Sequence, residues 1–306
     1  MALNVSWRQL VYFVATAEAG STLRASEALH ISQPAVSVAI SQLEQAFGQK
    51  LFVRRHAQGV DLTPFGRRKL AEVRHLIAHA HSVMGSSENE ELTGELEIGV
   101  FSTLAPSYLP GLLRFFADEY PKIRVRAREV TLGQIHRDLE DGVIELALLY
   151  DVDTIGDMQR IPLGAHTPYA IVAEGHPLAA NDKISLLDLA KEPFILIDLP
   201  HSRDYFLSLF RSAGVMPENL VRCTSLETLR GMVAHGLGNS LLVTRPFGDH
   251  STDGLPLICR SLVETVSPQG VIIGISRRAP VTAMAEAFVE STKAYFARQP
   301  ESHFLD

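Results

Sequence analysis

Residues 25–55, ASEALHISQPAVSVAISQLEQAFGQKLFVRR, decide the fold of the N-terminal part of this chain. Ser32 is a good helix cap, Pro34 is tolerated in a first turn, and apolar residues then follow at helical spacing. These apolar residues are Val36, Ile40, Leu43 and Phe47. The stretch therefore predicts a helix after Ser32 that buries one face and exposes small polar side chains on the other.

Two shorter helices are predicted before this one. Residues 6–19 carry apolar groups at helical spacing up to Gly20, and residues 22–29 form a second helix before a tight turn. The apolar positions are Leu10, Phe13, Val14 and Ala17 in the first helix and Ala25, Ala28 and Leu29 in the second. Residues 51–62 then read as two short strands. Together these segments predict a winged helix-turn-helix domain over residues 1–62.

The exposed face of the third helix suits the edges of DNA bases. Glutamine bonds adenine, serine donates or accepts, and two arginines on the hairpin can reach phosphates or the minor groove. The expected DNA contacts are Ser32, Gln33, Pro34, Ser37, Ser41, Arg54 and Arg55. The alternative is a three-helix bundle with no nucleic-acid role. The coincidence of turn, cap, polar face and basic hairpin favours double-stranded DNA as a partner.

Charge is unevenly distributed along the 306 residues. Residues 1–74 hold nine Lys and Arg against five Asp and Glu, whereas residues 75–306 hold 19 against 30. A basic N-terminal quarter in a chain of net charge −7 is typical of a part that meets a polyanion, although a solvated surface can carry the same excess of charge. The composition, 46% hydrophobic and 21% charged, excludes disorder, collagen-like repeats and a disulfide scaffold. We expect a cytoplasmic chain with no membrane segment, because neither a secretory signal nor a long apolar run is visible.

A long helix is predicted after the hairpin, beginning at Thr63 and Pro64. Its apolar residues recur at the spacing of a short coiled-coil seam, which predicts a dimerisation helix and a polar hinge over residues 63–91. The expected seam residues are Leu70, Val73, Ile77, Ala80 and Met84. His75 and His79 have the spacing of two metal ligands, but no third ligand is near, so we expect solvated surface histidines and no metal site.

Residues 25–66 resemble the N-terminal domain of LysR-type transcriptional regulators, because many residue types match at fixed spacings. The matching positions are Ala25, Leu29-His30-Ile31-Ser32-Gln33-Pro34-Ala35-Val36-Ser37, Ile40, Leu43-Glu44, Gly48, Leu51-Phe52-Val53-Arg54, Leu62-Thr63-Pro64 and Gly66. Val38 and Ser41 depart from the family pattern, in which a basic or larger polar side chain is common. The resemblance implies a homodimer or homotetramer that reads an inverted repeat, contacts RNA polymerase and carries a two-lobed effector domain.

Residues 92–306 alternate predicted strands and helices. The first segments, from a strand at 95–100 to a strand at 145–150, follow the order of a doubly wound parallel sheet. A second such unit follows, which includes strands expected at 169–173 and 194–197, and a strand and a helix close the chain. We therefore expect an α/β effector domain that resembles periplasmic solute-binding proteins, with lobe I at 92–162 and 268–306 and lobe II at 163–267.

Hydroxyl side chains follow two predicted strands, before helices expected at 105–119 and 204–213. Ligands of open α/β sheets bind at the carboxyl ends of strands, near helix N-termini. We therefore expect a small anionic effector of the carboxylate type, with no cofactor. The expected contacts are Ser102, Thr103, Thr131, Tyr150, Ser202, Arg203 and Thr224. The alternative is that Ser102 and Ser202 only cap helices and that Arg203 pairs with Asp204.

Other chemistry finds little support. Asp198, His201 and Ser202 lie close in sequence, but no nucleophile elbow accompanies them, so we expect no catalytic residues and no enzyme. Cys223 and Cys259 follow apolar segments and are expected to be reduced, buried and inert rather than a peroxide-sensing pair.

Residues 236–242 resemble the glycine-rich turn into a strand of the LysR family, from which Asn239 and the following Val243 depart. The competing interpretation of the whole chain is a solute-binding or enzymatic α/β protein whose N-terminal domain only oligomerises. Specific DNA binding separates the two interpretations.

Overall fold

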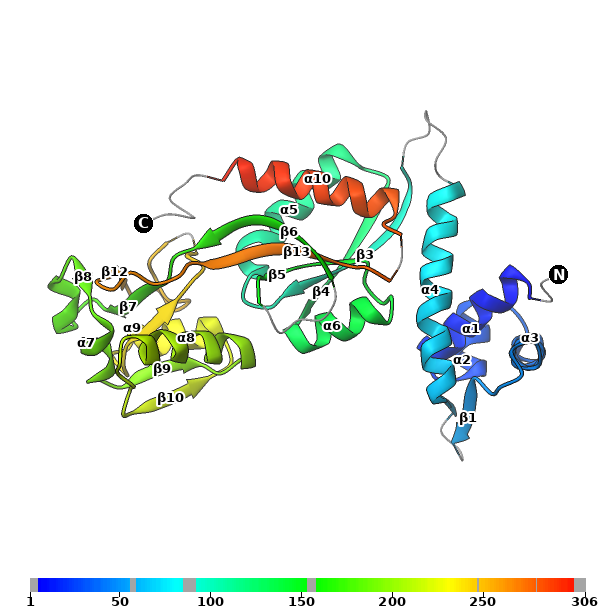
Figure 1. Cartoon of the computed structure of the whole chain (residues 1–306), viewed down its shortest axis with the longest axis horizontal. Coiled ribbons are helices and arrows are strands. Elements are labelled where there is room, and N and C mark those ends of the chain that lie inside the picture. The colour runs from blue at the N-terminus through cyan, green and yellow to red at the C-terminus, as the bar shows by residue number, and fades with distance from the viewer. Residues whose placement is uncertain are drawn as a thin grey trace.

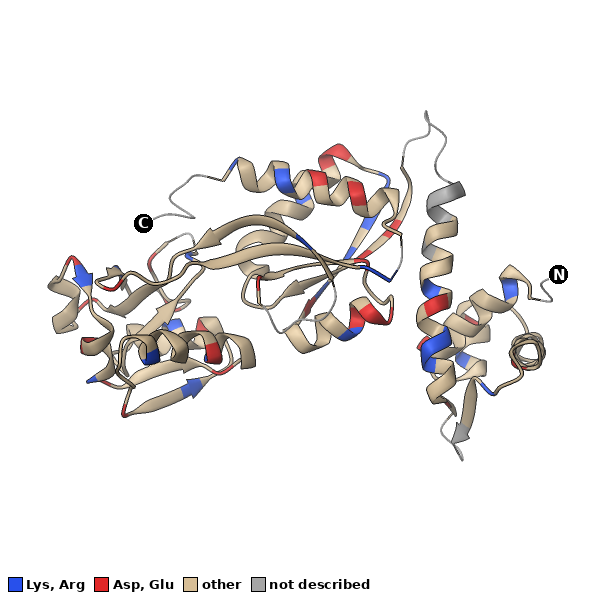
Figure 2. Ribbon diagram, in the orientation of Figure 1, with Lys and Arg blue, Asp and Glu red and all other residues tan. Residues whose placement is uncertain are grey.

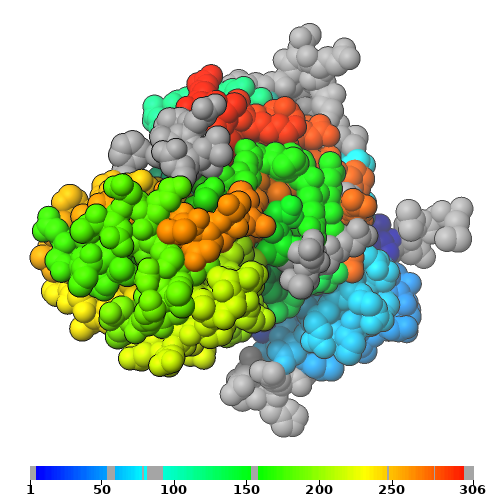
Figure 3. Space-filling view, turned by 60° about the vertical axis from the view of Figure 1, so that its left-hand side comes forward, coloured from blue at the N-terminus to red at the C-terminus, as the bar shows by residue number. Residues whose placement is uncertain are grey.

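The computed structural model describes residues 5–55, 59–84, 92–152, 158–246, 248–278 and 280–299. Figure 1 shows three parts in chain order: an N-terminal domain, the long helix α4, and an effector domain built from two lobes. In the space-filling view of Figure 3, the N-terminal domain, in blue, lies beside the effector domain.

The N-terminal domain is a winged helix-turn-helix. Its elements are α1 (Trp7–Ala19), α2 (Thr22–Ala28), α3 (Gln33–Phe47), β1 (Phe52–Arg55) and β2 (Gly59–Leu62). Ser6 and Gln9 form a capping box that begins α1. The buried Glu44 accepts a hydrogen bond from the backbone N–H of Leu51 at 2.9 Å, which ties the hairpin to α3. The apolar core contains Leu10, Phe13, Val36, Ile40, Leu43 and Leu51.

The hairpin packs closely on the turn between α1 and α2. Val60 donates its N–H to the carbonyl of Gly20 at 2.9 Å. A Cβ on Gly59, whose φ is +103°, would lie 2.2 Å from the same carbonyl oxygen. Only glycine therefore fits at this position of the hairpin.

Two details of this domain differ from the sequence expectations. Ala28 is exposed, and Ser26 is buried instead, because its hydroxyl donates to the carbonyl of Leu23 at 2.7 Å within α2. Ser32 stands at the N-cap of α3, but its side chain makes no capping hydrogen bond.

The helix α4 (Pro64–Met84) packs on its own N-terminal domain. Leu70 and Val73 are 7% and 5% exposed and belong to the same core as α1 and α3, with Ile77 partly buried beside them. The expected dimerisation seam is therefore wrong for Leu70 and Val73, because α1 already covers them. Ala80 is half-buried. The side chain of Met84 and the expected hinge lie outside the described residues.

The two helix histidines differ in their surroundings. His79 is exposed, as expected, whereas His75 is half-buried, and a Cβ on Gly142 of the effector domain would lie 3.1 Å from its ring. The expectation of two solvated histidines is thus wrong for His75. Within the described residues no group of three metal-ligating side chains is found.

Lobe I is a five-stranded mixed sheet with strand order β4-β3-β5-β13-β6. Its strands are β3 (Gly94–Phe101), β4 (Ile123–Val130), β5 (Leu146–Tyr150), β6 (Met158–His166) and β13 (Gln269–Ser276). β3 is parallel to β4 and β5, whereas β13 is antiparallel to β5 and β6. In Figure 1, α5 and α10 cover one face and α6 the other; these helices are α5 (Ala105–Glu119), α6 (Leu132–Glu140) and α10 (Ala283–Ala297).

Lobe II contains a four-stranded sheet, β11-β7-β12-β8, and the parallel pair β10-β9. The strands are β7 (Tyr169–Ala173), β8 (Lys183–Ile184), β9 (Phe194–Ile197), β10 (Leu220–Cys223), β11 (Ser240–Leu242) and β12 (Leu257–Leu262). A bridge between Phe194 and Asn239 joins the two groups of strands. The helices are η1 (Pro177–Ala180), α7 (Leu186–Ala190), α8 (Pro200–Ser212) and α9 (Leu226–Ala234).

The effector domain departs from its expected organisation in three places. The sheet of lobe I is mixed rather than parallel, because β13 returns to it from the far end of the chain. β6 stays in this sheet through His166, beyond the lobe division expected at residue 162. α8 begins at Pro200 rather than Asp204, which places His201 and Ser202 inside its first turn. No helix among the described residues is long and apolar enough to cross a membrane.

Candidate functional site

The outer face of α3 is lined by small and polar side chains. Gln33, Pro34 and Ser41 are exposed and Ser37 is half-buried, because the intervening apolar positions fill the domain core. Gln33 donates its side-chain N–H to the hydroxyl of Thr22 at 3.4 Å, a weak bond that a DNA base can replace. This arrangement gives α3 the chemistry of a recognition helix.

Further exposed side chains on the same face were missed by the sequence reasoning. They are Val38, Gln42 and Gln45. The available signal was helical spacing, because Val38 is four residues after Pro34, Gln42 is four after Val38, and Gln45 is four after Ser41. Val38 is 55% exposed, and its methyl groups suit the 5-methyl group of thymine.

The hairpin and α4 carry further basic residues of the N-terminal part. Arg54 and Arg55 pair through their backbones with Val60 and Gly59, and their side chains lie outside the described residues. Figure 2 shows Lys and Arg on the N-terminal half of α4, next to the hairpin. Among them, Arg67 and Arg68 are exposed, so α4 adds positive charge that the sequence reasoning did not assign to DNA.

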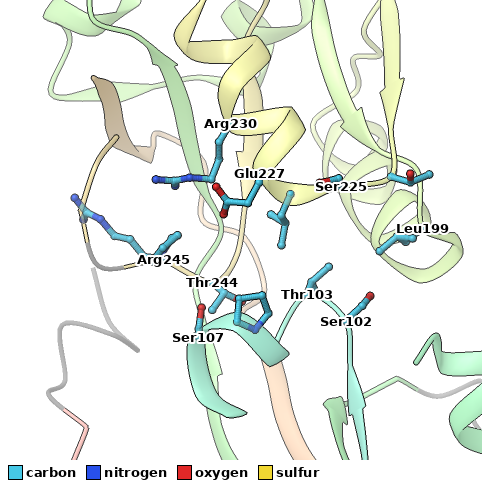
Figure 4. A pocket seen from close by; sticks show the side chains of 13 residues that line it. Ser102, Thr103, Ser107, Leu199, Ser225, Glu227, Arg230, Thr244 and Arg245 are labelled. Atoms are coloured by element: carbon cyan, nitrogen blue, oxygen red, sulfur yellow. The ribbon is translucent and has the colours of Figure 1, made fainter. Parts of the chain in front are cut away.

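A cavity of about 480 Å³ lies between the two lobes. Lobe I contributes the turn after β3, and lobe II contributes the start of α9 and the segment after β11 (Figure 4). The polar lining residues include Ser102, Thr103, Thr224, Glu227, Arg230 and Arg245. This volume accommodates a small organic molecule.

A second, smaller cavity of about 20 Å³ shares Thr103, Leu226 and Thr244 with the first. Its lining includes Tyr150, His201, Ser202, Tyr205 and Val243. Burial lowers the pKa of His201 and raises the pKa of Tyr150, so the imidazole is neutral and the phenol keeps its proton near neutral pH. This inner end of the cleft therefore offers uncharged hydrogen-bonding groups.

The structure brings together five of the seven expected effector contacts. Ser102, Thr103 and Thr224 line the larger cavity, and Tyr150 and Ser202 line the smaller one. Thr103 is 7% exposed, and its hydroxyl has no hydrogen-bond partner within the described residues.

Arg203 and Thr131 line neither cavity. Arg203 pairs with Asp198 at 3.1 Å and with Asp204 at 3.2 Å, as in the alternative stated for it, so its expected place in the cleft is wrong. Thr131 is exposed at the N-cap of α6, where its carbonyl accepts from the N–H groups of Gln134 and Ile135.

Arg230 is the cleft cation that the sequence reasoning missed. The residue is 2% exposed, and Nη2 donates to the carbonyls of Gly248 at 3.1 Å and His250 at 2.7 Å. Nη1 has no hydrogen-bond partner in the described part of the chain. A buried guanidinium with a free donor in a cavity wall is poised for an anion. The only sequence signal was a charged residue beside the apolar Leu229 of α9.

Of the two unusual residues at the glycine-rich turn, Val243 lines the smaller cavity, whereas Asn239 has a structural role. Asn239 is fully buried, donates to the carbonyl of Leu189 at 3.2 Å and lines neither cavity. A Cβ on Gly238, whose φ is +154°, would lie 2.3 Å from the carbonyl oxygen of Pro193, so the turn packs against the start of β9.

The two cysteines are half-buried and lie on different strands of lobe II. Cys223 ends β10, and Cys259 is in β12, with β9, β11 and β7 between them. Four strand spacings of about 4.8 Å place them roughly 19 Å apart, far beyond the reach of a disulfide. Burial raises the pKa of the Cys259 thiol to about 12, which keeps it protonated.

The fold and the two sites define a class: a ligand-responsive regulator with a DNA-binding domain and a two-lobed ligand-binding domain. Residues 7–67 match the family model described as bacterial regulatory helix-turn-helix protein, lysR family, and residues 89–297 match the LysR substrate binding domain. The chain belongs to the LysR family of transcriptional regulators, whose members bind DNA, form oligomers and are not enzymes.

Known proteins of similar sequence or structure extend over nearly the whole chain. The uncharacterised regulator YvbU of Bacillus subtilis is 30% identical, over 95% of this chain and 99% of that protein. HinK, a LysR family regulator from Pseudomonas aeruginosa, is 38% identical, with a TM-score of 0.65 over 95% of this chain and 99% of that one. A full-length OxyR variant from the same organism is 25% identical, with a TM-score of 0.78 over 94% and 98% of the two chains.

Proposed function

We propose that this LysR-type regulator binds an inverted-repeat operator and responds to a small carboxylate effector in the cleft between its lobes. The proposal rests chiefly on the free Nη1 donor of Arg230, which is buried in the wall of the 480 Å³ cavity. The hydroxyl of Thr103, also without a partner among the described residues, lines the cavity from the other lobe. A carboxylate bound to both would hold the lobes together.

On the DNA side, we propose that Gln33, Pro34, Ser37 and Ser41 contact bases, and that Ser32, Arg54 and Arg55 contact the backbone or the minor groove. The exposure of Ser32, Gln33, Pro34 and Ser41 on the outer face of α3 supports this assignment. The operator would be read by a homodimer or homotetramer, whose shape after effector binding alters contact with RNA polymerase. The effector must then bind one arrangement of the subunits better than the other.

The division of the chain at residues 62 and 91 belongs to the same proposal. The effector domain is proposed to move relative to the helix-turn-helix and α4, which share one apolar core.

The cleft assignment is tested with the full-length chain and a panel of C2–C8 carboxylates, each compared with its uncharged amide. We expect at least one carboxylate, and not its amide, to raise the melting temperature. Calorimetry should then show its affinity roughly 10- to 100-fold lower in Arg230→Met, the range expected for a charge-assisted hydrogen bond.

Arg203→Met is the matched control, because it removes the same charge from outside the cavity. Its carboxylate affinity should equal that of the wild type. Stabilisation by amides as strong as by carboxylates, or equal affinities in the two variants, would overturn the assignment.

A further inference from the structure

The cleft contains a carboxylate as well as a guanidinium. Glu227 lines the same 480 Å³ cavity as Arg230. The two residues are three apart on α9, so they share one face of the helix, with their Cβ atoms about 5–6 Å apart. Figure 4 shows Glu227 between Arg230 and the hydroxyl groups of lobe I. A ligand in this cavity therefore meets both signs of charge on one helical turn.

These two charges do not neutralise each other in the structure. Arg230 donates to the carbonyls of Gly248 and His250, and Glu227 accepts a hydrogen bond from the hydroxyl of Thr252 at 2.7 Å. Arg245, the other cation of the cavity wall, pairs with Asp249 at 2.9 Å. No ion pair joins Glu227 to a Lys or Arg in the described part of the chain, so its charge is available to a ligand.

A ligand with only a carboxylate fits this arrangement poorly. Bound at Arg230, its negative charge would lie within one helical turn of the Glu227 carboxylate and be repelled by it. A ligand that also carries an ammonium group converts this repulsion into attraction. The two charged groups of an α-amino acid lie on one carbon atom, which suits two opposite charges on neighbouring positions of one helix face.

We infer that the effector is a zwitterion of the amino-acid class, with its carboxylate at Arg230 and Thr103 and its ammonium group at Glu227. This inference rests on the proposed cleft function. Glu227 also lies in the first turn of α9, where the positive end of the helix dipole stabilises a negative charge. That role stabilises the fold whatever the ligand is, and it does not discriminate between a carboxylate and an amino acid.

The test uses matched trios and the full-length chain. Each trio contains an L-amino acid, the acid that lacks its amino group and the amine that lacks its carboxylate, for example leucine, 4-methylpentanoate and 3-methylbutylamine. Trios formed from the common amino acids are screened by melting temperature, and the best trio is measured by calorimetry. We expect the amino acid to bind at least about tenfold more tightly than either partner, since each partner lacks one charge-assisted contact.

Two glutamine variants separate recognition from helix stability. Glu227→Gln retains a side-chain oxygen for Thr252 but loses the charge, and the preference for the amino acid over the deaminated acid should fall to about one. Glu192→Gln removes an exposed carboxylate that does not line the cavity and should leave the preference unchanged.

The possible failures are distinguishable. If the deaminated acid binds as tightly as the amino acid, or if Glu227→Gln keeps the preference, the zwitterion is overturned while the carboxylate site stands. If no member of any trio binds, or if the amine binds most tightly, both the zwitterion and the carboxylate site are overturned.

Discussion

The hydroxyl of Tyr150, at the end of β5, lies 2.8 Å from the hydroxyl of Thr244, which follows β11. This buried hydrogen bond joins lobe I to lobe II beside the cleft. Within lobe II, the hydroxyl of Tyr169 donates to the carbonyl of Thr244 at 3.2 Å and so fixes the position of this residue. Thr244 thus joins lobe II to lobe I through its hydroxyl, and it lines both cavities.

Tyr150→Phe should lower the free energy of unfolding by about 1–2 kcal/mol, because it leaves the buried Thr244 hydroxyl without its partner. Urea denaturation measures this loss. Thr244→Val and the double variant complete a cycle in which the double variant should cost less than the two single changes added together. Additive costs would show that the two hydroxyls do not interact.

Leu70→Ala should destabilise the N-terminal domain by about 2–5 kcal/mol, since it empties a core position between α1 and α4. Leu76→Ala is the control from the same helix, because Leu76 is 49% exposed, and it should leave the stability of the monomer nearly unchanged. Thermal unfolding at several protein concentrations separates this effect from loss of dimer. A cost of Leu70→Ala that disappears at low concentration would restore Leu70 to a dimer seam.

Stability should fall as the pH drops below about 6.5, the usual pKa of histidine. Burial lowers the pKa of His201 and of His75 in the folded state, so the unfolded chain takes up protons that the folded chain does not. The contribution of these two histidines to the free energy of unfolding is complete above about pH 6.5. It is lost as the pH falls toward their lower pKa values in the folded state. Urea unfolding between pH 7.5 and 5.5 measures the slope.

His201→Gln should make this slope shallower. His79→Gln removes one histidine from the exposed face of α4 and is the matched control. A slope that is equally steep in His201→Gln and in the wild type would contradict the assignment to His201.

Cys259 should resist alkylation in the folded protein. With a pKa of about 12, its thiolate fraction at pH 8 is about one in ten thousand. We expect iodoacetamide to label it far more slowly in buffer than in 6 M urea. Hydrogen peroxide should leave Cys223 and Cys259 unlinked, as measured by intact mass. Formation of a disulfide between them in the folded state would contradict the strand order of lobe II.

The elements that the sequence predicted well are those whose hydrophobic period is unambiguous. The strands Tyr169–Ala173 and Phe194–Ile197 have the predicted limits, because each is a short apolar run that follows a proline and precedes an acidic residue. β6 and β12 were not predicted. β6 contains Pro162 and alternates buried and exposed residues irregularly, so its pairing with β13 depends on a segment about a hundred residues away.

Prediction of the functional sites fails for the same reason, because some roles depend on contacts that form only in the folded chain. Apolar spacing on α4 identified the face that is buried, but the same spacing fits a coiled coil and a helix packed on its own domain, so it could not identify what covers Leu70. Similarly, the role of Arg230 depends on the carbonyls of Gly248 and His250, which only the folded chain brings to it. Ser102 and Thr103 were predictable because they follow a strand end that the sequence marks clearly.

We propose above all that α3 reads a specific DNA sequence. The most direct measurement is a selection of genomic fragments bound by the full-length chain at roughly 150 mM salt, where nonspecific phosphate binding is weak. It is repeated with Gln33→Ala/Ser37→Ala, which leaves the buried face of α3 intact. We predict enrichment of an intergenic inverted repeat by the wild type and its loss in the double variant. Fragments without a shared sequence, or the same fragments bound by both proteins, would contradict the account.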